Sequence, residues 1–267
     1  MDITRWWIDW VTDVVLGDAA ICFAQERKFM GATTFRIPGN VWDQGVSHAY
    51  PDLGYAKGGS KINQLKRNYY NEESVREAKK KMSERAAQTI TSVGISTIGG
   101  AKANSQGHCI RSVVVSRYSP KITVSRQQEV YLDVFYRTTE LLRKFGADLL
   151  FLKDFLVPEI LEGNPWGVKT PTAVRMYFSS CFFSALFIPV LYQFIDPTAF
   201  LQQLYKKEGD SQFYRRVVFR TKAMLERDAS HYKFQSRRNM QNLAMGFMDQ
   251  DKIDRKALEK HLKKITK

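Results

Sequence analysis

Arg137 and the two hydroxyl residues that follow it, Thr138 and Thr139, could together hold a phosphate group. A guanidinium is planar and donates parallel hydrogen bonds to phosphate oxygens, and neighbouring hydroxyls add neutral donors. These residues lie within residues 131–148, where the pattern changes from the alternation of a strand to the apolar spacing of a helix. The sequence therefore predicts an anion-binding arginine at the end of a strand. An ordinary surface arginine is the alternative interpretation.

The composition is that of a folded, strongly basic protein. The chain has 267 residues, 44% of them apolar, with 41 Lys and Arg against 27 Asp and Glu for a formal charge of +14. Such a chain can bury a large core, which excludes a disordered protein. The charge predicts an anionic partner, which could be a nucleotide, a nucleic acid or an acidic surface.

The three cysteines and the uncharged segments indicate a cytoplasmic protein. Cys22, Cys109 and Cys181 are widely spaced, so neither a disulfide framework nor a metal site is expected. We find no secretory leader at the start. Residues 176–195 carry no charge over a length close to that of a membrane span, but they contain several polar residues and begin with an alternating pattern. We expect a buried strand and helix there and no membrane association.

The elements read from periodicity place the chain in the α+β class. An amphipathic helix is expected at residues 3–23, capped by Asp2 or Thr4, and a charged helix at residues 72–92. The strands are too many for a helical bundle, yet long helices flank them. The expected strands are residues 32–37, 111–120, 121–124 paired with 129–136, and 173–180, with a further helix at 147–160.

The chain divides into a core of residues 1–195 and a helical, basic C-terminal extension of residues 196–267. Residues 205–267 contain 17 Lys and Arg but only 8 Asp and Glu, and aromatic residues alternate with the basic ones. A surface that binds nucleic acid combines phosphate contacts with aromatic stacking in this way. An ordinary amphipathic basic helix has the same pattern, so both interpretations stay open.

The order of elements in residues 3–195 resembles the thymidylate synthase family, and within it the deoxycytidylate hydroxymethylase branch. The sharpest point of similarity is Arg137-Thr138-Thr139-Glu140, which matches the family's Arg-Ser-x-Asp motif. In the family, the residue that reads the pyrimidine edge comes eleven positions after this arginine. Here that residue is Asp148.

In this family, enzymes acting on deoxyuridylate have Asn at that position and cytidylate hydroxymethylases have Asp. A carboxylate can accept a hydrogen bond from the exocyclic amine of cytosine, whereas an amide can match both the donor and the acceptor of uracil. The resemblance therefore implies that Asp148 binds the base of a cytosine nucleotide. An ordinary polar helix residue is the other interpretation.

The resemblance also implies a set of phosphate ligands and an oligomeric state. Arg27 or Lys28 would be the basic residue of a mobile phosphate loop, and Arg137 with Thr138 would grip the phosphate from the same subunit. Arg111 would reach into the site of a neighbouring subunit, which implies a homodimer. The expected ligand is a pyrimidine nucleoside monophosphate.

Two departures from the family pattern affect the chemistry. The family's nucleophilic cysteine should lie within residues 112–136, which contain none, and Cys109 precedes Arg111 by two residues. The family's sugar-contacting His-x-Tyr pair should fall near residues 182–184, which contain neither residue type. We see no folate-site signature, although folate would be the cofactor if the family chemistry were retained.

Two functions follow from this sequence. The chain is either a pyrimidine nucleotide-binding protein, with transferase chemistry that has changed and catalytic residues that are unknown, or a catalytically inactive homodimeric scaffold. The scaffold would bind DNA, RNA or a partner protein through its basic C-terminal region.

Overall fold

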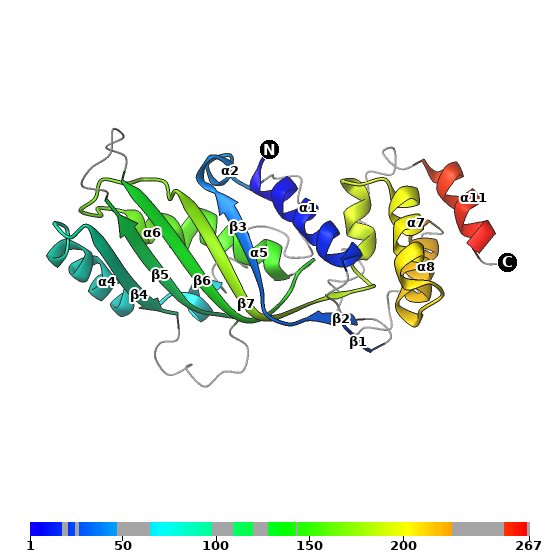
Figure 1. The fold of residues 1–267 in the computed structure, drawn as a ribbon, viewed down its shortest axis with the longest axis horizontal. Helices are drawn as coiled ribbons and strands as arrows, with labels where there is room; N and C mark the ends of the chain where they lie inside the picture. The colour runs from blue at the N-terminus through cyan, green and yellow to red at the C-terminus, as the bar shows by residue number, and fades with distance from the viewer. Residues whose placement is uncertain are drawn as a thin grey trace.

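The chain has an α+β fold built on one mixed sheet, shown by a computed structural model that describes residues 1–17, 21–24, 27–46, 65–97, 109–119, 128–142, 144–225 and 254–265. The strands follow the order β1-β2-β7-β6-β5-β4, and β3 also pairs with β7 (Figure 1). Their bounds are β1 Ile21–Ala24, β2 Arg27–Met30, β3 Thr33–Pro38, β4 Ile90–Ser96, β5 Ile110–Tyr118, β6 Glu129–Glu140 and β7 Ala173–Ser184.

The centre of the sheet is the parallel pair β6 and β7. The pairing runs from Tyr131 opposite Ala173 to Glu140 opposite Phe182, and all other described pairs are antiparallel. A parallel pair needs a long crossover. Three consecutive helical segments supply it: α5 (Lys144–Phe151), the π-helix η2 (Leu152–Leu156) and α6 (Val157–Leu161).

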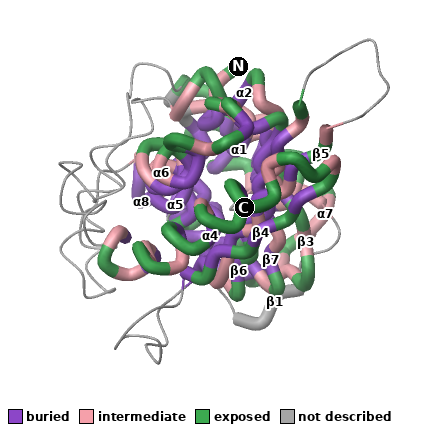
Figure 2. Tube along the Cα trace, turned by 90° about the vertical axis from the view of Figure 1, so that its left-hand side faces the viewer, coloured by how far each residue is buried: buried purple, intermediate pink, exposed green. Residues whose placement is uncertain are grey.

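Helices cover one face of the sheet around an aromatic core. Helix α1 (Ile3–Leu16) brings Trp10 against Phe35 of β3 and Phe178 of β7, with ring centroids 4.6 and 5.9 Å apart. Phe145 of α5 packs edge-on against Phe178. In Figure 2 the buried segments lie inside and the exposed ones on the outside. Further helices are α2 (Gly39–Asp43) and α4 (Glu72–Glu84), the latter packed beside β4.

The C-terminal helices form a group at the β1–β2 end of the sheet (Figure 1). Helices α7 and α8 pack on each other, on the short 3-10 helix η3, and on α11. Lys207 donates a hydrogen bond to the carbonyl of Val15, which joins this group to α1. The bounds are η3 Ile188–Gln193, α7 Pro197–Glu208, α8 Gln212–Leu225 and α11 Arg255–Ile265.

The structure confirms the fold class and several elements, but it corrects the boundaries of two helices. Asp2 does cap α1, yet the helix expected at residues 3–23 ends at Leu16, because Gly17 leaves the helical conformation and β1 follows. The helix expected at residues 72–92 ends at Glu84, and residues 90–96 form β4. Arg27 and Lys28, expected in a phosphate loop, lie on strand β2.

The uncharged segment 176–195 forms the greater part of β7 and then η3, as expected. Among the described residues, none of the helices has both the length and the apolar character needed to cross a bilayer. The hairpin partner expected at residues 121–124 lies outside the described residues.

Candidate functional site

Four buried polar side chains meet where β5 begins and β6 ends. We call Tyr69, Cys109, Tyr136 and Asp148 the polar cluster; each is at most 9% exposed. The backbone N–H of Cys109 donates to the Tyr69 hydroxyl at 3.1 Å. The backbone N–H of Arg137 donates to the carbonyl of Cys109 at 2.8 Å, which fixes Cys109 beside the end of β6.

Local sequence explains why the side chains of Tyr136 and Asp148 are buried. Tyr136 alternates inward with Leu132 and Val134 along β6, so its ring enters the aromatic core beside Phe145 and Phe178. Asp148 lies on α5, a helix that is apolar on nearly all sides and therefore buried. The carboxylate is consequently held away from solvent.

The electrostatics of the polar cluster keep its thiol and phenols protonated. Burial raises the pKa of Cys109, and the charge of Asp148 raises it further. The hydrogen bond from Tyr69 and the charges of Lys144 and Arg137 act in the opposite direction. Burial also raises the pKa of Tyr69 and of Tyr136, in both cases with Asp148 as the next cause.

The raised pKa of Cys109 bears on its chemistry. Nucleophilic cysteines normally have a lowered pKa in an electropositive setting, because the thiolate is the reactive form. The side chain of Cys109 is therefore a neutral thiol in this site. His108, its neighbour in sequence, lies outside the described residues.

Tyr136 carries an unusual hydroxyl. The residue is 2% exposed, and its oxygen has no hydrogen-bond partner in the described part of the chain. A buried polar group without a partner costs about 1–3 kcal/mol. Its position beside Asp148 therefore suits a polar ligand group or a water molecule.

Arg137 and Thr138, predicted from the sequence, lie at the end of β6, and Asp148 lies on α5, which packs against that strand. Arg137 is exposed and Thr138 half-buried at the end of β6, and Thr138 pairs with Ser180 of β7. The charges of Arg137 and Asp148 both influence the pKa of Cys109, in opposite directions. Consecutive strand residues point to opposite faces, so Thr138 follows the inward face of Tyr136, whereas Arg137 lies on the outer face with Phe135, opposite the face that α5 and Asp148 cover.

Of the alternatives Arg27 and Lys28, the structure leaves Arg27 on the surface. Lys28 is 3% exposed and forms an ion pair with Glu208 of α7. Arg27 is exposed and lies over the ring of Phe182, with its guanidinium carbon 5.6 Å from the ring centroid. Phe182 on β7 pairs with Glu140 at the end of β6, so strand β7 lies between Arg27 and that end.

Arg111 lies on β5 at a bulge between Ile110 and Ser112 and is half-buried. Its carbonyl accepts a hydrogen bond from the N–H of Thr97. Arg111 follows Cys109 by two residues, so it is next to the polar cluster in sequence.

Tyr69, Tyr136 and Lys144 were not predicted as site residues. Of these three residues, only Tyr136 had a local sequence signal for a role in the site, because it directly precedes Arg137.

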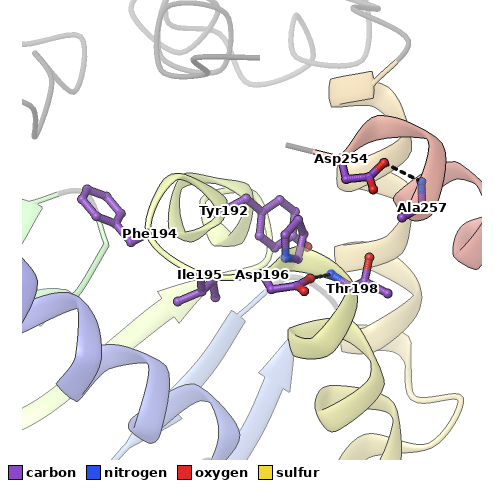
Figure 3. A pocket seen from close by; sticks show the side chains of 8 residues that line it. Tyr192, Phe194, Ile195, Asp196, Thr198, Asp254 and Ala257 are labelled. Carbon is purple, nitrogen blue, oxygen red and sulfur yellow. Dashed lines mark hydrogen bonds between the residues drawn. The ribbon is translucent and has the colours of Figure 1, made fainter. Parts of the chain in front are cut away.

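A separate cavity of about 470 Å³ lies between η3, the start of α7 and the start of α11 (Figure 3). Asp196 and Asp254 line it, but each carboxylate caps a helix: Asp196 accepts from the N–H of Thr198 at 2.7 Å and Asp254 from that of Ala257 at 3.0 Å. The described residues contain no group of three or more His, Cys, Asp or Glu suited to a metal ion. We therefore take the polar cluster as the candidate site.

Neither the known protein families nor the curated proteins include one that matches this chain.

Proposed function

We propose that this protein is a divergent thymidylate-synthase-like protein that binds a pyrimidine nucleoside monophosphate, cytosine in preference to uracil. The arrangement that supports this proposal lies at the end of β6, where Arg137 directly follows Tyr136 and where α5 packs against the strand and brings the buried Asp148 close enough to raise the pKa of Tyr136. An arginine suits the phosphate end of such a ligand, and a buried carboxylate suits the base end. The hydroxyl of Tyr136 offers a further polar contact beside Asp148.

Any group transfer at this site would differ from the addition of a preformed thiolate. The pKa of Cys109 is raised by burial and by Asp148, so the thiol is protonated in the free protein at neutral pH. The proposed activity is therefore that of a pyrimidine-modifying transferase with altered chemistry. In the competing proposal, the chain is an inactive scaffold and the polar cluster is purely structural.

Calorimetric titration with deoxycytidylate, cytidylate and deoxyuridylate distinguishes these functions. We expect saturable binding below millimolar concentration, tightest for a cytosine nucleotide, with weaker binding after Arg137→Gln. Arg36→Gln is the matched control, because Arg36 is also an exposed strand arginine but lies on β3. Absence of binding by all three nucleotides would leave the scaffold function.

We also propose a homodimer formed through the face of the sheet opposite the aromatic core. On this face Asp133 pairs with Arg175 through two hydrogen bonds of 2.6 and 2.7 Å, and Phe135 stacks on Tyr177 at 5.1 Å. Most neighbouring positions on β4 and β5 are small, namely Ser92, Gly94, Ser96, Ser112 and Ser116, and the larger Val114, Ile90 and Tyr118 lie on the same face.

Such a face suits a second copy of the same sheet. Its central charges are already neutralised within the chain, its small residues permit close approach, and Phe135 is 38% exposed. Sedimentation velocity should show a dimer that Phe135→Asp converts to a monomer. Phe219→Asp on α8 is the control, since Phe219 has the same exposed fraction. A monomeric wild-type protein would contradict this part of the proposal.

A further inference from the structure

The lysines of helix α11 differ from those of α4, although both helices are rich in charge. Helix α4 contains four acidic and four basic residues, and its three consecutive lysines each form an ion pair. The pairs are Lys79 with Glu159, Lys80 with Glu84 and Lys81 with Glu77, at 3.7, 3.9 and 3.0 Å. The positive charge of α4 is therefore largely neutralised.

Helix α11 has five Lys and Arg residues and a single acidic residue, Glu259. Its four lysines are exposed, and within the described residues none of them forms an ion pair. We call them the lysine row: Lys256, Lys260, Lys263 and Lys264. Spacings of three, four and seven residues put them on one side of a helix.

The opposite side of α11 is already used in packing. Leu258 and Leu262 are 0% and 3% exposed, and α11 contacts both α7 and α8. A helix that lies in a membrane surface must insert its apolar face among the lipids. Because that face is buried here, the surface that α11 presents is one of charge alone, which favours a polyanion over a lipid bilayer.

The dimensions of the lysine row fit a phosphate backbone. From Lys256 to Lys264 the helix rises about 12 Å, at 1.5 Å per residue. A DNA duplex carries one negative charge per about 1.7 Å of its axis with both strands counted, so a duplex segment of this length carries about seven phosphates on its two strands. Lysine is a compact point charge and suits phosphates better than base edges, which predicts binding without sequence preference.

We infer that the lysine row of α11 is a binding surface for the phosphate backbone of nucleic acid. The two helices that α11 contacts also carry exposed aromatic residues: Tyr205 on α7 and Phe219 on α8 are 49% and 38% exposed. Exposed rings can stack on unpaired bases. This function is independent of nucleotide binding at the polar cluster, since it uses other residues at the other end of the chain.

The test compares two double variants of the full-length protein by fluorescence anisotropy with a labelled 20-base-pair DNA duplex. Lys260→Gln with Lys264→Gln removes two charges from the lysine row, and Lys80→Gln with Lys81→Gln removes two from α4. Each lysine that contacts a phosphate contributes about one to the slope of log affinity against log salt. We expect the α11 variant to lose about two from this slope and the α4 variant to keep the wild-type slope.

Equal losses in both variants would mean that binding follows net charge alone and would overturn the inference. Absence of duplex binding at low salt would also overturn it, unless single-stranded DNA or RNA binds with the same dependence on Lys260 and Lys264. Vesicles with anionic phospholipids serve as the remaining arm. Binding to vesicles but to no nucleic acid would assign the lysine row to a membrane and refute our choice.

Discussion

The polar cluster and the lysine row hold their charge in opposite settings. Asp148 is 3% exposed and acts on a thiol and two phenols, all with raised pKa. The lysines of α11 face solvent and have no acidic partner in the described part of the chain. In a buried setting the pKa of each group depends on its immediate neighbours, so a single substitution changes the pKa of several groups. On an exposed helix the charges act nearly independently and are screened by salt.

The buried ion pair of Lys28 and Glu208 gives the strongest test of this contrast. Ser211 also donates to Glu208, and the Lys28 ammonium lies 5.1 Å from the centre of the Phe213 ring. Removing one partner of a buried pair typically costs 3–5 kcal/mol, because the other charge stays buried. We expect Lys28→Met to lower the free energy of unfolding by about 3–5 kcal/mol, as measured by urea denaturation.

Two further variants complete this test. Lys28→Met with Glu208→Leu should recover most of the loss, because an apolar pair of similar volume replaces the charges. Lys80→Met breaks the exposed pair with Glu84 and should change the free energy of unfolding by less than about 0.5 kcal/mol. A small loss in Lys28→Met would show that the contrast between buried and exposed charge is weaker than the structure indicates.

Asp148→Asn is the next largest test, since it alters the proposed base contact without changing the shape of the side chain. An amide matches uracil as well as it matches cytosine, whereas the carboxylate favours the cytosine amine. Discrimination by such a contact is worth about 1–3 kcal/mol. We expect the ratio of affinities for deoxycytidylate and deoxyuridylate to shift toward uracil by roughly tenfold or more, measured by calorimetry.

An unchanged ratio in Asp148→Asn would remove Asp148 from base recognition. Glu159→Gln is a suitable control, because Glu159 is a half-buried carboxylate that bonds to Tyr70 and Lys79 away from the polar cluster. It should leave the ratio unaltered. A shift in both variants would point to a general effect of charge.

The sequence predicted the elements that carry Arg137 and Asp148 better than it predicted their surroundings. Arg137 lies on strand β6 and Asp148 on the helix that follows it, and local periodicity reveals such elements. The burial of Lys28 had no local signal, because its partner Glu208 is 180 residues away. Tyr69 is likewise joined to Cys109 only by the tertiary fold.

Strand β4 shows a second limit of sequence interpretation. Its sequence, Ile90–Ser96, alternates correctly for a strand, with Thr91, Val93 and Ile95 buried. It follows a charged helix closely and contains Ser, Thr and Gly, so the local pattern predicts a helix as far as residue 92. The parallel pairing of β6 with β7 also depends on long-range packing that local patterns do not encode.

The reactivity of Cys109 tests whether Asp148 and Arg137 shift the pKa of its thiol in opposite directions. Asp148 raises the pKa of the thiol and Arg137 lowers it. Asp148→Asn should therefore move the pH profile of Cys109 alkylation to lower pH, and Arg137→Gln should move it to higher pH. Mass spectrometry separates Cys109 from Cys181, whose pKa burial raises to about 12. Shifts in the same direction would show that altered access, not charge, controls the thiol.

The smallest expected effect is on His261, which lies among the lysines of α11. Burial lowers its pKa, and the charge of Lys264 lowers it further. Because the folded-state pKa is below the usual 6.5, protonation favours the unfolded chain, and the free energy of unfolding should fall as the pH drops through 6.5 and below. His261→Gln should remove this dependence.

An NMR titration of His261 also connects this residue to nucleic acid. Lys264→Gln should raise the pKa of His261, because it removes the second of the two causes that lower it. Duplex DNA on the lysine row should raise the pKa as well, since phosphates offset the charge of Lys264. A pKa that responds to Lys264→Gln but not to DNA would separate the local electrostatics of α11 from its proposed ligand.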